Sequence, residues 1–496
     1  MLFLNFQFTW SGYSDIHIAD EQIKSVKEIG NGFLITGYFY NDDGYADVII
    51  MKIDKLGNVV WAKYFGDFYV DDVGYDILIL NDGFLIFGTT NQGSIDGYND
   101  LFLAKFTNNG DLIWAKIYKY PGQVYANEII RDSNSYILVS KIAPGNVSLH
   151  PFVINVDTNG NIIWAKFYGY PSDIQEYSPA YYFDRIALKI NDGFFILGSK
   201  IYQVQPSYHY DIYLLKIDNN ENPLWAKSYG GDNVPSHNEN ASSIIKSIDG
   251  NYYIIGSYGS FSVSQYGIYL LKIDQNGNLI KSKVYYQNMG ASSGLRIFQN
   301  NDKLIIPYSN YSSYYPLGIL VIDTSGSIFS NKQQFLIRSD ITDIIETNEG
   351  LFAIGYTLDN NAKPFEVNFN FLDKIGFSCN QNIDVSYLSS NAFTNVQNLQ
   401  NPSVDDITNN IIISDYNILP KNKSITITLS CLTYIRETTQ YKINGNIIKF
   451  KNTVKFSIYK PNGSIYFKGY GNEFKFKENG LYFIKLENEV FRVFIP

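Results

Sequence analysis

The sequence predicts an all-β protein, and three observations lead to this prediction. Tyr, Phe and Trp make up 16% of the 496 residues, and with abundant Ile, Asn, Gly and Ser they favour strands and tight turns. A block of about 50 residues recurs along the chain. Each block holds four strand-like runs, which in the second block span residues 73–80, 84–90, 101–107 and 112–118.

The clearest part of the block is the motif D-x-x-G-x-x-x-W-A-K-x-Y. Its Trp recurs at intervals of 50 to 61 residues, at Trp10, Trp61, Trp114, Trp164 and Trp225. Degenerate equivalents at Lys281, Ser330 and about Cys379 extend the series to seven periods. We interpret the Trp as core between neighbouring repeats, and expect the Lys two positions later to reach the rim or a neighbouring repeat.

A second signature is an apolar strand that ends in Gly, and it supports the same count. It occurs at residues 31–37, 82–88 and 192–198, and again up to Gly256 and Gly355. Degenerate copies end at Ser140 and pass through Pro307, which again gives seven. Four strands in each of seven periods predict a seven-bladed β-propeller over residues 1–379. The chain begins at a fourth strand, so we expect the N-terminal strand to complete the last blade and join the ends of the ring.

The string W-A-K-x-Y-G, followed by an acidic segment and D-G-x-x-I-x-G, resembles the repeat of secreted bacterial and archaeal seven-bladed propellers. The form of that repeat is W-x-K-x-Y-G-G with a D-x-x-G-N hairpin. The resemblance covers about residues 10–379 and fades in the last three repeats. It implies an exported propeller with a binding role, and it transfers no catalytic motif.

Long Tyr-rich loops are expected on one face of the ring, at residues 38–47, 89–100, 200–211 and 309–316. Binding residues collect on such loops, and Tyr beside Asn, Asp and Ser suits a glycan or protein ligand. The alternative is plain solvated surface. The candidate binding residues are Tyr38, Tyr45, Tyr98, Tyr208, Tyr210, Tyr311 and Tyr314.

No catalytic motif is present, so we expect a binding scaffold, not an enzyme. The four His residues neither repeat nor cluster, and no metal site is expected. Asp47, Asp100 and Asp211 open third strands, where they cap turns or, alternatively, serve as an acid and base pair or hold calcium. The alternative function is a polysaccharide-active enzyme, a glycosidase or lyase, with carboxylates at the channel mouth. No cofactor is expected, and calcium stays open through the acidic loops 41–43 and 96–100.

Beyond the repeats, residues 380–432 are polar and are expected to form a linker with short strands. Residues 433–496 have Asn-Gly turns and predict a small β-sandwich. Their hairpin pattern is similar to the C-terminal sorting domain of type IX secretion cargo, which implies an attachment or sorting module. An extracellular or cell-surface location is therefore expected, although no signal peptide is visible in residues 1–10.

The charge is uneven along the chain. The net charge is −9, but residues 441–496 carry nine Lys and one Arg against four Glu, roughly +6. The acidic balance argues against nucleic acid binding, and no apolar run is long enough for a transmembrane helix. The basic module is a candidate for envelope attachment or self-association.

The two cysteines, Cys379 and Cys431, are 52 residues apart and have no partner at metal-ligand spacing. We predict that they form a disulfide in an oxidising compartment, and two unpaired buried thiols are the alternative.

Overall fold

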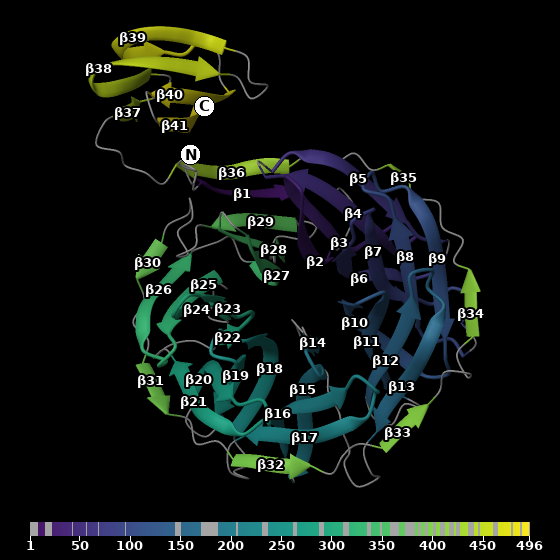
Figure 1. Cartoon of the computed structure of the whole chain (residues 1–496). Coiled ribbons are helices and arrows are strands. Elements are labelled where there is room, and N and C mark those ends of the chain that lie inside the picture. Colours follow the sequence, from purple (N-terminus) through teal and green to yellow (C-terminus); the bar gives the residue numbers. More distant parts are fainter. Residues whose placement is uncertain are drawn as a thin grey trace.

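The computed structural model is an all-β ring with a small separate sheet at its C-terminal end (Figure 1). It describes the chain except short gaps and residues 1–7, 15–21, 144–149, 170–186, 231–236, 261–264, 287–291, 311–316, 335–338, 358–366, 373–381, 407–411, 416–420, 423–426, 435–440 and 460–464. Among the described residues there is no helix with the length and apolar character to cross a bilayer.

The ring consists of antiparallel meanders whose first strand lies nearest the centre (Figure 1). The described strands supply seven meanders, here called blades 1 to 7. Blade 1 is β2 (Gln22–Ile29), β3 (Gly32–Tyr40), β4 (Ala46–Asp54) and β5 (Val59–Phe65). Blade 2 is β6 (Asp72–Ile79), β7 (Phe84–Thr90), β8 (Asp100–Phe106) and β9 (Leu112–Lys119). Blade 3 is β10 (Gln123–Asp132), β11 (Ser135–Ala143), β12 (His150–Asp157) and β13 (Ile162–Gly169).

The remaining blades follow the same order. Blade 4 is β14 (Ala187–Ile190), β15 (Gly193–Val204), β16 (Ser207–Asp218) and β17 (Pro223–Gly230). Blade 5 is β18 (His237–Lys246), β19 (Tyr252–Ser260), β20 (Gln265–Ile273) and β21 (Leu279–Tyr286). In blade 6, β22 (Ser292–Gly294) and β23 (Phe298–Asn300) precede β24 (Lys303–Asn310), β25 (Leu317–Asp323) and β26 (Ile328–Gln334). Blade 7 is β27 (Ser339–Glu346), β28 (Leu351–Thr357), β29 (Val367–Leu372) and β1 (Phe8–Ser14).

The two ends of the repeat region meet in blade 7, as the sequence predicts. The N-terminal strand β1 pairs antiparallel with β29, with Trp10 opposite Phe371. A strand from one end of the chain thus completes a blade from the other end, and this removes two edges that an open array would expose.

The described strands of residues 380–432, a segment expected as a linker, instead lie around the outside of the ring. Seven short strands in this part of the chain each pair antiparallel with the outermost strand of one blade, in the order of blades 6, 5, 4, 3, 2, 1 and 7 (Figure 1). We call them the belt: β30 (Asn382–Asp384), β31 (Leu388–Asn391), β32 (Asn395–Leu399), β33 (Ser403–Asp406), β34 (Ile412–Asp415), β35 (Lys421–Asn422) and β36 (Ile427–Tyr434).

The belt changes the expected domain boundary, because its last strand runs past residue 432. In β36, Tyr434 pairs with Phe8 and Cys431 with Ser11 of β1. The short strands were expected, but their pairing makes the segment a fifth layer of strands in the ring rather than a spacer. An edge strand needs a partner for its N–H and C=O groups, and the outer strands of the blades supply it.

The predicted disulfide concerns the two ends of the belt. Cys431 lies in β36, and Cys379 lies outside the described residues, just before β30; no disulfide is present in the part of the chain that the structure describes. The bridge therefore stays a prediction. If it forms, non-reduced denatured protein should release no thiol, and titration of two thiols would refute it; the expected contribution is on the order of 3 to 4 kcal/mol.

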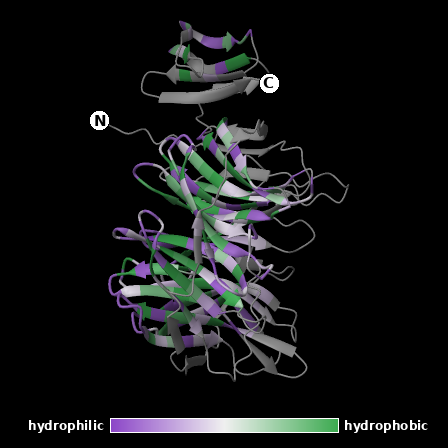
Figure 2. Ribbon diagram, turned by 90° about the vertical axis from the view of Figure 1, so that its right-hand side faces the viewer, coloured by the Kyte–Doolittle hydropathy of each residue, from purple (hydrophilic) through white to green (hydrophobic). Residues whose placement is uncertain are grey.

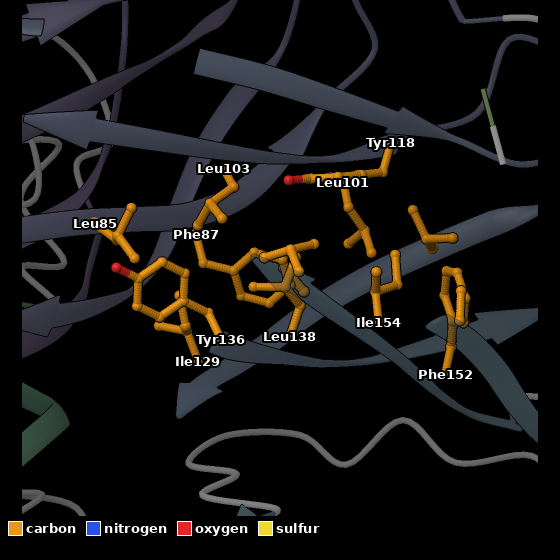
Figure 3. Close-up of a cluster of buried hydrophobic side chains, with 14 of the residues drawn as sticks. Leu85, Phe87, Leu101, Leu103, Tyr118, Ile129, Tyr136, Leu138, Phe152 and Ile154 are labelled. Atoms are coloured by element: carbon orange, nitrogen blue, oxygen red, sulfur yellow. The ribbon is translucent and has the colours of Figure 1, made fainter. Parts of the chain in front are cut away.

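The hydrophobic core lies between neighbouring blades, since each blade presents one sheet face to the next. Between blades 2 and 3, Phe87 and Leu103 pack against Leu138 and Ile154, and all four are fully buried (Figure 3). Hydrophobic residues follow the strands, and hydrophilic ones mark the short turns (Figure 2). Similar clusters recur between other blades, so the ring is stabilised by one core per interface.

The repeated motif W-A-K-x-Y joins blades 1 to 4 to the hairpin of the next blade, a contact that we call the clamp. The Trp114 ring packs against Gly160, where a Cβ atom would approach the ring to 2.9 Å. Two residues on, Lys116 Nζ donates to Asn161 Oδ1 at 2.6 Å, and the Tyr118 hydroxyl donates to the Gly160 carbonyl at 2.8 Å. Gly160 also has a φ of +77°, which favours glycine. The Trp and Lys expectations are confirmed, and the D-x-x-G-N hairpin is the receiving half of the clamp.

The C-terminal residues form a sheet with its own core. It contains five described strands, and β38 pairs with β39 on one edge and with β37 and β40 on the other. Phe456, Ile458, Phe476 and Tyr482 are among its buried residues. The strands are β37 (Tyr441–Asn444), β38 (Ile447–Tyr459), β39 (Ile465–Lys475), β40 (Gly480–Leu486) and β41 (Glu489–Ile495).

Candidate functional site

The structure does not bring the first three predicted binding tyrosines into one site. Tyr38, at the end of β3, is half-buried, with its ring 5.6 Å from the ring of Tyr40. Tyr45 precedes β4, and its ring lies 5.5 Å from Tyr69. Tyr98 lies in the loop before β8, where its N–H donates to Asp96 Oδ1. Tyr38 therefore belongs to an aromatic group, while Tyr45 and Tyr98 lie in separate loops.

Two of the other tyrosines lie in a strand and not in a loop, which corrects the expected loop at residues 200–211. The strands β15 and β16 extend into a long hairpin, so Tyr208 pairs with Gln203 and Tyr210 with Ile201. The alternation of Tyr with other residues in this segment is typical of a strand. We interpreted the Tyr-rich composition of the sequence as a loop and did not use this alternation. Tyr311 and Tyr314 lie outside the described residues.

The innermost strands contain the feature that the sequence analysis missed. In five blades the innermost strand has a β-bulge, so that one extra residue faces no partner in the neighbouring strand. Bulges re-aim side chains and are common next to functional sites. The extra residues, which we call the inner polar ring, are Lys24, Tyr75, Asn127, Ser242 and Thr342.

The Gly that ends the second sequence signature lies directly beside these bulges. Gly37 pairs with Ile23, just before the extra residue Lys24, and a Cβ at Gly37 would lie 2.7 Å from the Ile23 Cα. Gly88 and Gly256 are placed in the same way, against Gly74 and Ala241. A small residue at this place is therefore the sequence signal of the bulge, because it leaves room for the displaced inner strand: it is Gly in four of the five blades and Ser140 in blade 3.

Lys24 and four tyrosines form one cluster, here called the Lys24 cluster: Lys24, Tyr38, Tyr40, Tyr75 and Tyr125. Lys24 Nζ lies 5.6 Å from the centre of the Tyr38 ring and 5.9 Å from that of Tyr75. Burial raises the pKa of the Tyr75 hydroxyl, and the nearby hydroxyls of Tyr125 and Tyr40 add to this. Three adjacent blades contribute, since Tyr75 belongs to β6 and Tyr125 to β10. Cations over aromatic faces and Tyr hydroxyls together can bind a polar ligand with apolar faces.

The buried carboxylates of the innermost strands connect blades. Asp76 Oδ1 accepts from Ser25 Oγ at 2.8 Å and from Lys27 Nζ at 2.7 Å, both in blade 1. Its Oδ2 accepts from the N–H of Ile129 in blade 3 at 3.1 Å. Glu128 accepts likewise from the N–H of Ala187 in blade 4. These side chains hold the ring together, so they are poor candidates for the carboxylate pair of the enzyme alternative.

Of the third-strand carboxylates, Asp100 has the most perturbed environment. It is 1% exposed, and its Oδ1 accepts from the Tyr120 N–H at 3.3 Å. Its Oδ2 has no hydrogen-bond partner in the described part of the chain. Burial raises the pKa of Asp100 from 3.8 to about 7. Asp47 accepts instead from Asn41 Nδ2 at 3.1 Å, which suits the turn-capping interpretation.

The raised pKa of Asp100 predicts a pH-dependent stability effect. The folded state holds a proton that the unfolded state releases, so the carboxyl destabilises the fold increasingly from about pH 4 to pH 7 and fully above that. Asp100→Asn should therefore gain stability relative to wild type as pH rises, on the order of 1 to 3 kcal/mol at pH 8. Urea unfolding at pH 5 and pH 8 measures this.

Asp82→Asn is the matched control, because Lys105 lowers the pKa of Asp82. Its stability relative to wild type should not rise with pH. A flat difference for Asp100→Asn between pH 5 and pH 8 would show that the carboxyl titrates normally.

In the loops considered for calcium, side-chain oxygen atoms accept hydrogen bonds from backbone N–H groups. Asn41 Oδ1 accepts from the N–H groups of Asp43 and Tyr45, and Asp96 Oδ2 accepts from the Gly122 N–H at 2.6 Å. Among the residues that the structure describes, no group of three or more His, Cys, Asp or Glu side chains gathers in a way that could hold a metal ion.

Comparisons with known proteins find likeness in fold only. No protein-family model matches the chain. No curated protein matches it. Solved structures that resemble it include a protein described as a 6-phosphogluconolactonase from Bacteroides uniformis, with 13% identity and a TM-score of 0.40 over 77% of this chain and 100% of that one. The polysaccharide lyase Uly1 has 7% identity and a TM-score of 0.39 over 71% and 90%. A europium-containing methanol dehydrogenase has 8% identity and a TM-score of 0.36 over 73% and 92%. At these scores the likeness adds nothing to the argument for a function.

Proposed function

We propose that the protein is an exported or cell-surface scaffold that binds a glycan, with the Lys24 cluster as the main contact. The observation that carries this proposal is the inner polar ring, because repeated bulges bring a phenol, an amide, two hydroxyls and an ammonium to equivalent positions in five blades. Hydroxyl and amide groups exchange hydrogen bonds with sugar hydroxyls, and tyrosine rings pack on sugar faces.

A binding role is favoured over catalysis by what the buried carboxylates do. Asp76 and Glu128 bond to the backbone of neighbouring blades, and Asp96, the carboxylate near Asp100, accepts from the N–H groups of Tyr98 and Gly122. Glycosidic acid and base chemistry uses two carboxyl groups on either side of the bond that breaks.

The C-terminal sheet is proposed to attach or sort the protein at the cell envelope. Its own core and its charge of roughly +6 beside an acidic ring support a separate unit. The resemblance of its hairpins to sorting domains of type IX cargo supports the same role.

The binding proposal is tested by a glycan array with the full chain, followed by calorimetry with the best glycan. Tyr125→Ala should weaken binding of that glycan about three- to tenfold, and because Tyr125 is 43% exposed we expect the variant to fold. Tyr470→Ala, a 75% exposed tyrosine of the C-terminal sheet, is the control and should bind as wild type does. An array without binding, or equal effects of the two variants, would overturn the proposal.

A further inference from the structure

Lys24 is a half-buried lysine of the innermost strand of blade 1 that has no carboxylate partner among the described residues. Its Nζ donates to Gln22 Oε1 at 2.8 Å and lies over two tyrosine rings, and within the described residues it forms no ion pair. Other lysines of the ring do, as in the pairs Lys27 with Asp76 and Lys216 with Asp192. Lys116 and Lys227 also lack a carboxylate partner, but they donate to oxygen atoms in the hairpin of the next blade, whereas Lys24 lies among aromatic rings.

The burial of Lys24 without a counter-charge is unfavourable for the folded state. Taking an ammonium group out of water without a counter-charge is unfavourable, and the contacts with Gln22 and the tyrosine rings offset only part of this. Burial lowers the pKa of Lys24 from 10.5 to about 8. At pH 7 about nine-tenths of the side chain is still protonated, so the cluster retains a cation that an incoming anion can pair with. The titratable side chains that face it are Tyr38 from β3 and Tyr75 from β6.

Asn127, another member of the inner polar ring, is a second candidate contact for the ligand. It lies two residues after Tyr125 in β10, and its Oδ1 atom is buried without a hydrogen-bond partner among the described residues. An unsatisfied buried acceptor costs free energy, and a ligand hydroxyl would satisfy it. A cation, an acceptor and several aromatic rings thus belong to blades 1, 2 and 3.

We infer that the glycan bound at the Lys24 cluster is acidic, with a carboxylate or sulfate on a sugar ring pairing with Lys24 and a ring hydroxyl donating to Asn127. This inference rests on the proposed glycan-binding function and narrows it to one ligand class. The tyrosine rings contact the apolar face of the sugar, and the neutral groups of the inner polar ring take the remaining hydroxyls.

The test uses matched ligands on the full chain. Oligogalacturonate, its carboxyl-reduced neutral counterpart of the same length, and a sulfated galactan oligomer are titrated by calorimetry at pH 7. We expect one of the two acidic oligomers to bind at least tenfold more tightly than the neutral one, and the preferred oligomer identifies the acidic group. Lys24→Met should abolish this preference, and Lys24→Arg should keep it.

Lys105→Met is the control for the loss of one positive charge, because Lys105 lies on the rim and pairs with Asp82. It should leave the preference unchanged. Equal binding of acidic and neutral oligomers, or a preference that survives Lys24→Met, would overturn the inference while leaving glycan binding intact. Absence of binding by every oligomer and by the glycan array would overturn the proposed function itself. Melting curves of the Lys24 variants show that they are folded.

Discussion

A chain that ends at residue 378, and therefore lacks the belt, is expected to melt roughly 10 °C or more below the full chain. The belt supplies backbone hydrogen bonds to the outermost strand of every blade, from β26 in blade 6 to β1 in blade 7. At about 0.5 to 1.5 kcal/mol net for each bond, these pairs contribute on the order of 10 kcal/mol in total. Removing them also exposes one strand edge on each blade, so the shortened ring should aggregate as its concentration rises.

A chain that ends at Tyr434 is the matched control. It keeps β36 complete and removes only the C-terminal sheet, whose core is separate. Its melting temperature should stay near that of the full chain, while surface retention should fall, and any lysine-dependent retention should weaken as salt rises. Scanning calorimetry of the full chain and of the chains that end at residues 378 and 434 measures the three melting temperatures. Equal melting of the two shortened chains would show that the belt does not hold the ring.

Asp343→Ala should be among the most destabilising single substitutions, at about 3 to 5 kcal/mol. Asp343, 1% exposed, accepts from Arg296 of blade 6 and, at 2.9 Å, from the N–H of Val26 in blade 1. It therefore connects blades 6, 7 and 1, where the ring closes. Alanine leaves the guanidinium of Arg296 buried without this carboxylate, and the Val26 N–H without this acceptor.

Urea unfolding of two further variants makes this prediction specific. The double variant Arg296→Met with Asp343→Leu should recover part of the lost stability, because it removes the buried charge that the single variant leaves behind. Asp82→Ala breaks an exposed rim pair with Lys105 and should cost less than about 1 kcal/mol. Similar losses for Asp343→Ala and Asp82→Ala would contradict a closing role for Asp343.

The contacts between blades could be predicted from the sequence because the first four blades repeat the same motif. Trp114 and Lys116 reach the hairpin of the next blade, and the same residue types recur about 50 residues apart. The closing strand could be predicted as well, since Trp10 carries the signature of a fourth strand, and β1 pairs with the third strand of blade 7.

The inner polar ring could not be predicted, because its members are five different residue types. Lys24, Tyr75 and Asn127 share a backbone position and not a side chain, and the residue opposite the bulge is Gly37 or Gly88 for the first two and Ser140 for the third. The small residue opposite the bulge could be recognised in the sequence. Which residue of the inner strand is the extra one depends on how that strand pairs with its neighbour, and only the structure shows this.

By itself, the sequence determined the all-β class and the repeating blades with their clamps, since these depend on residues close together in the chain or on one repeated motif. The tertiary structure alone decided that residues 380–432 form a belt. Its strands are two to eight residues long and have no partner nearby in the sequence, so β33 forms only because β13, more than 200 residues earlier, offers it an edge. Short polar strands of this kind carry no signal of their own, because their stability comes from the surface on which they pair.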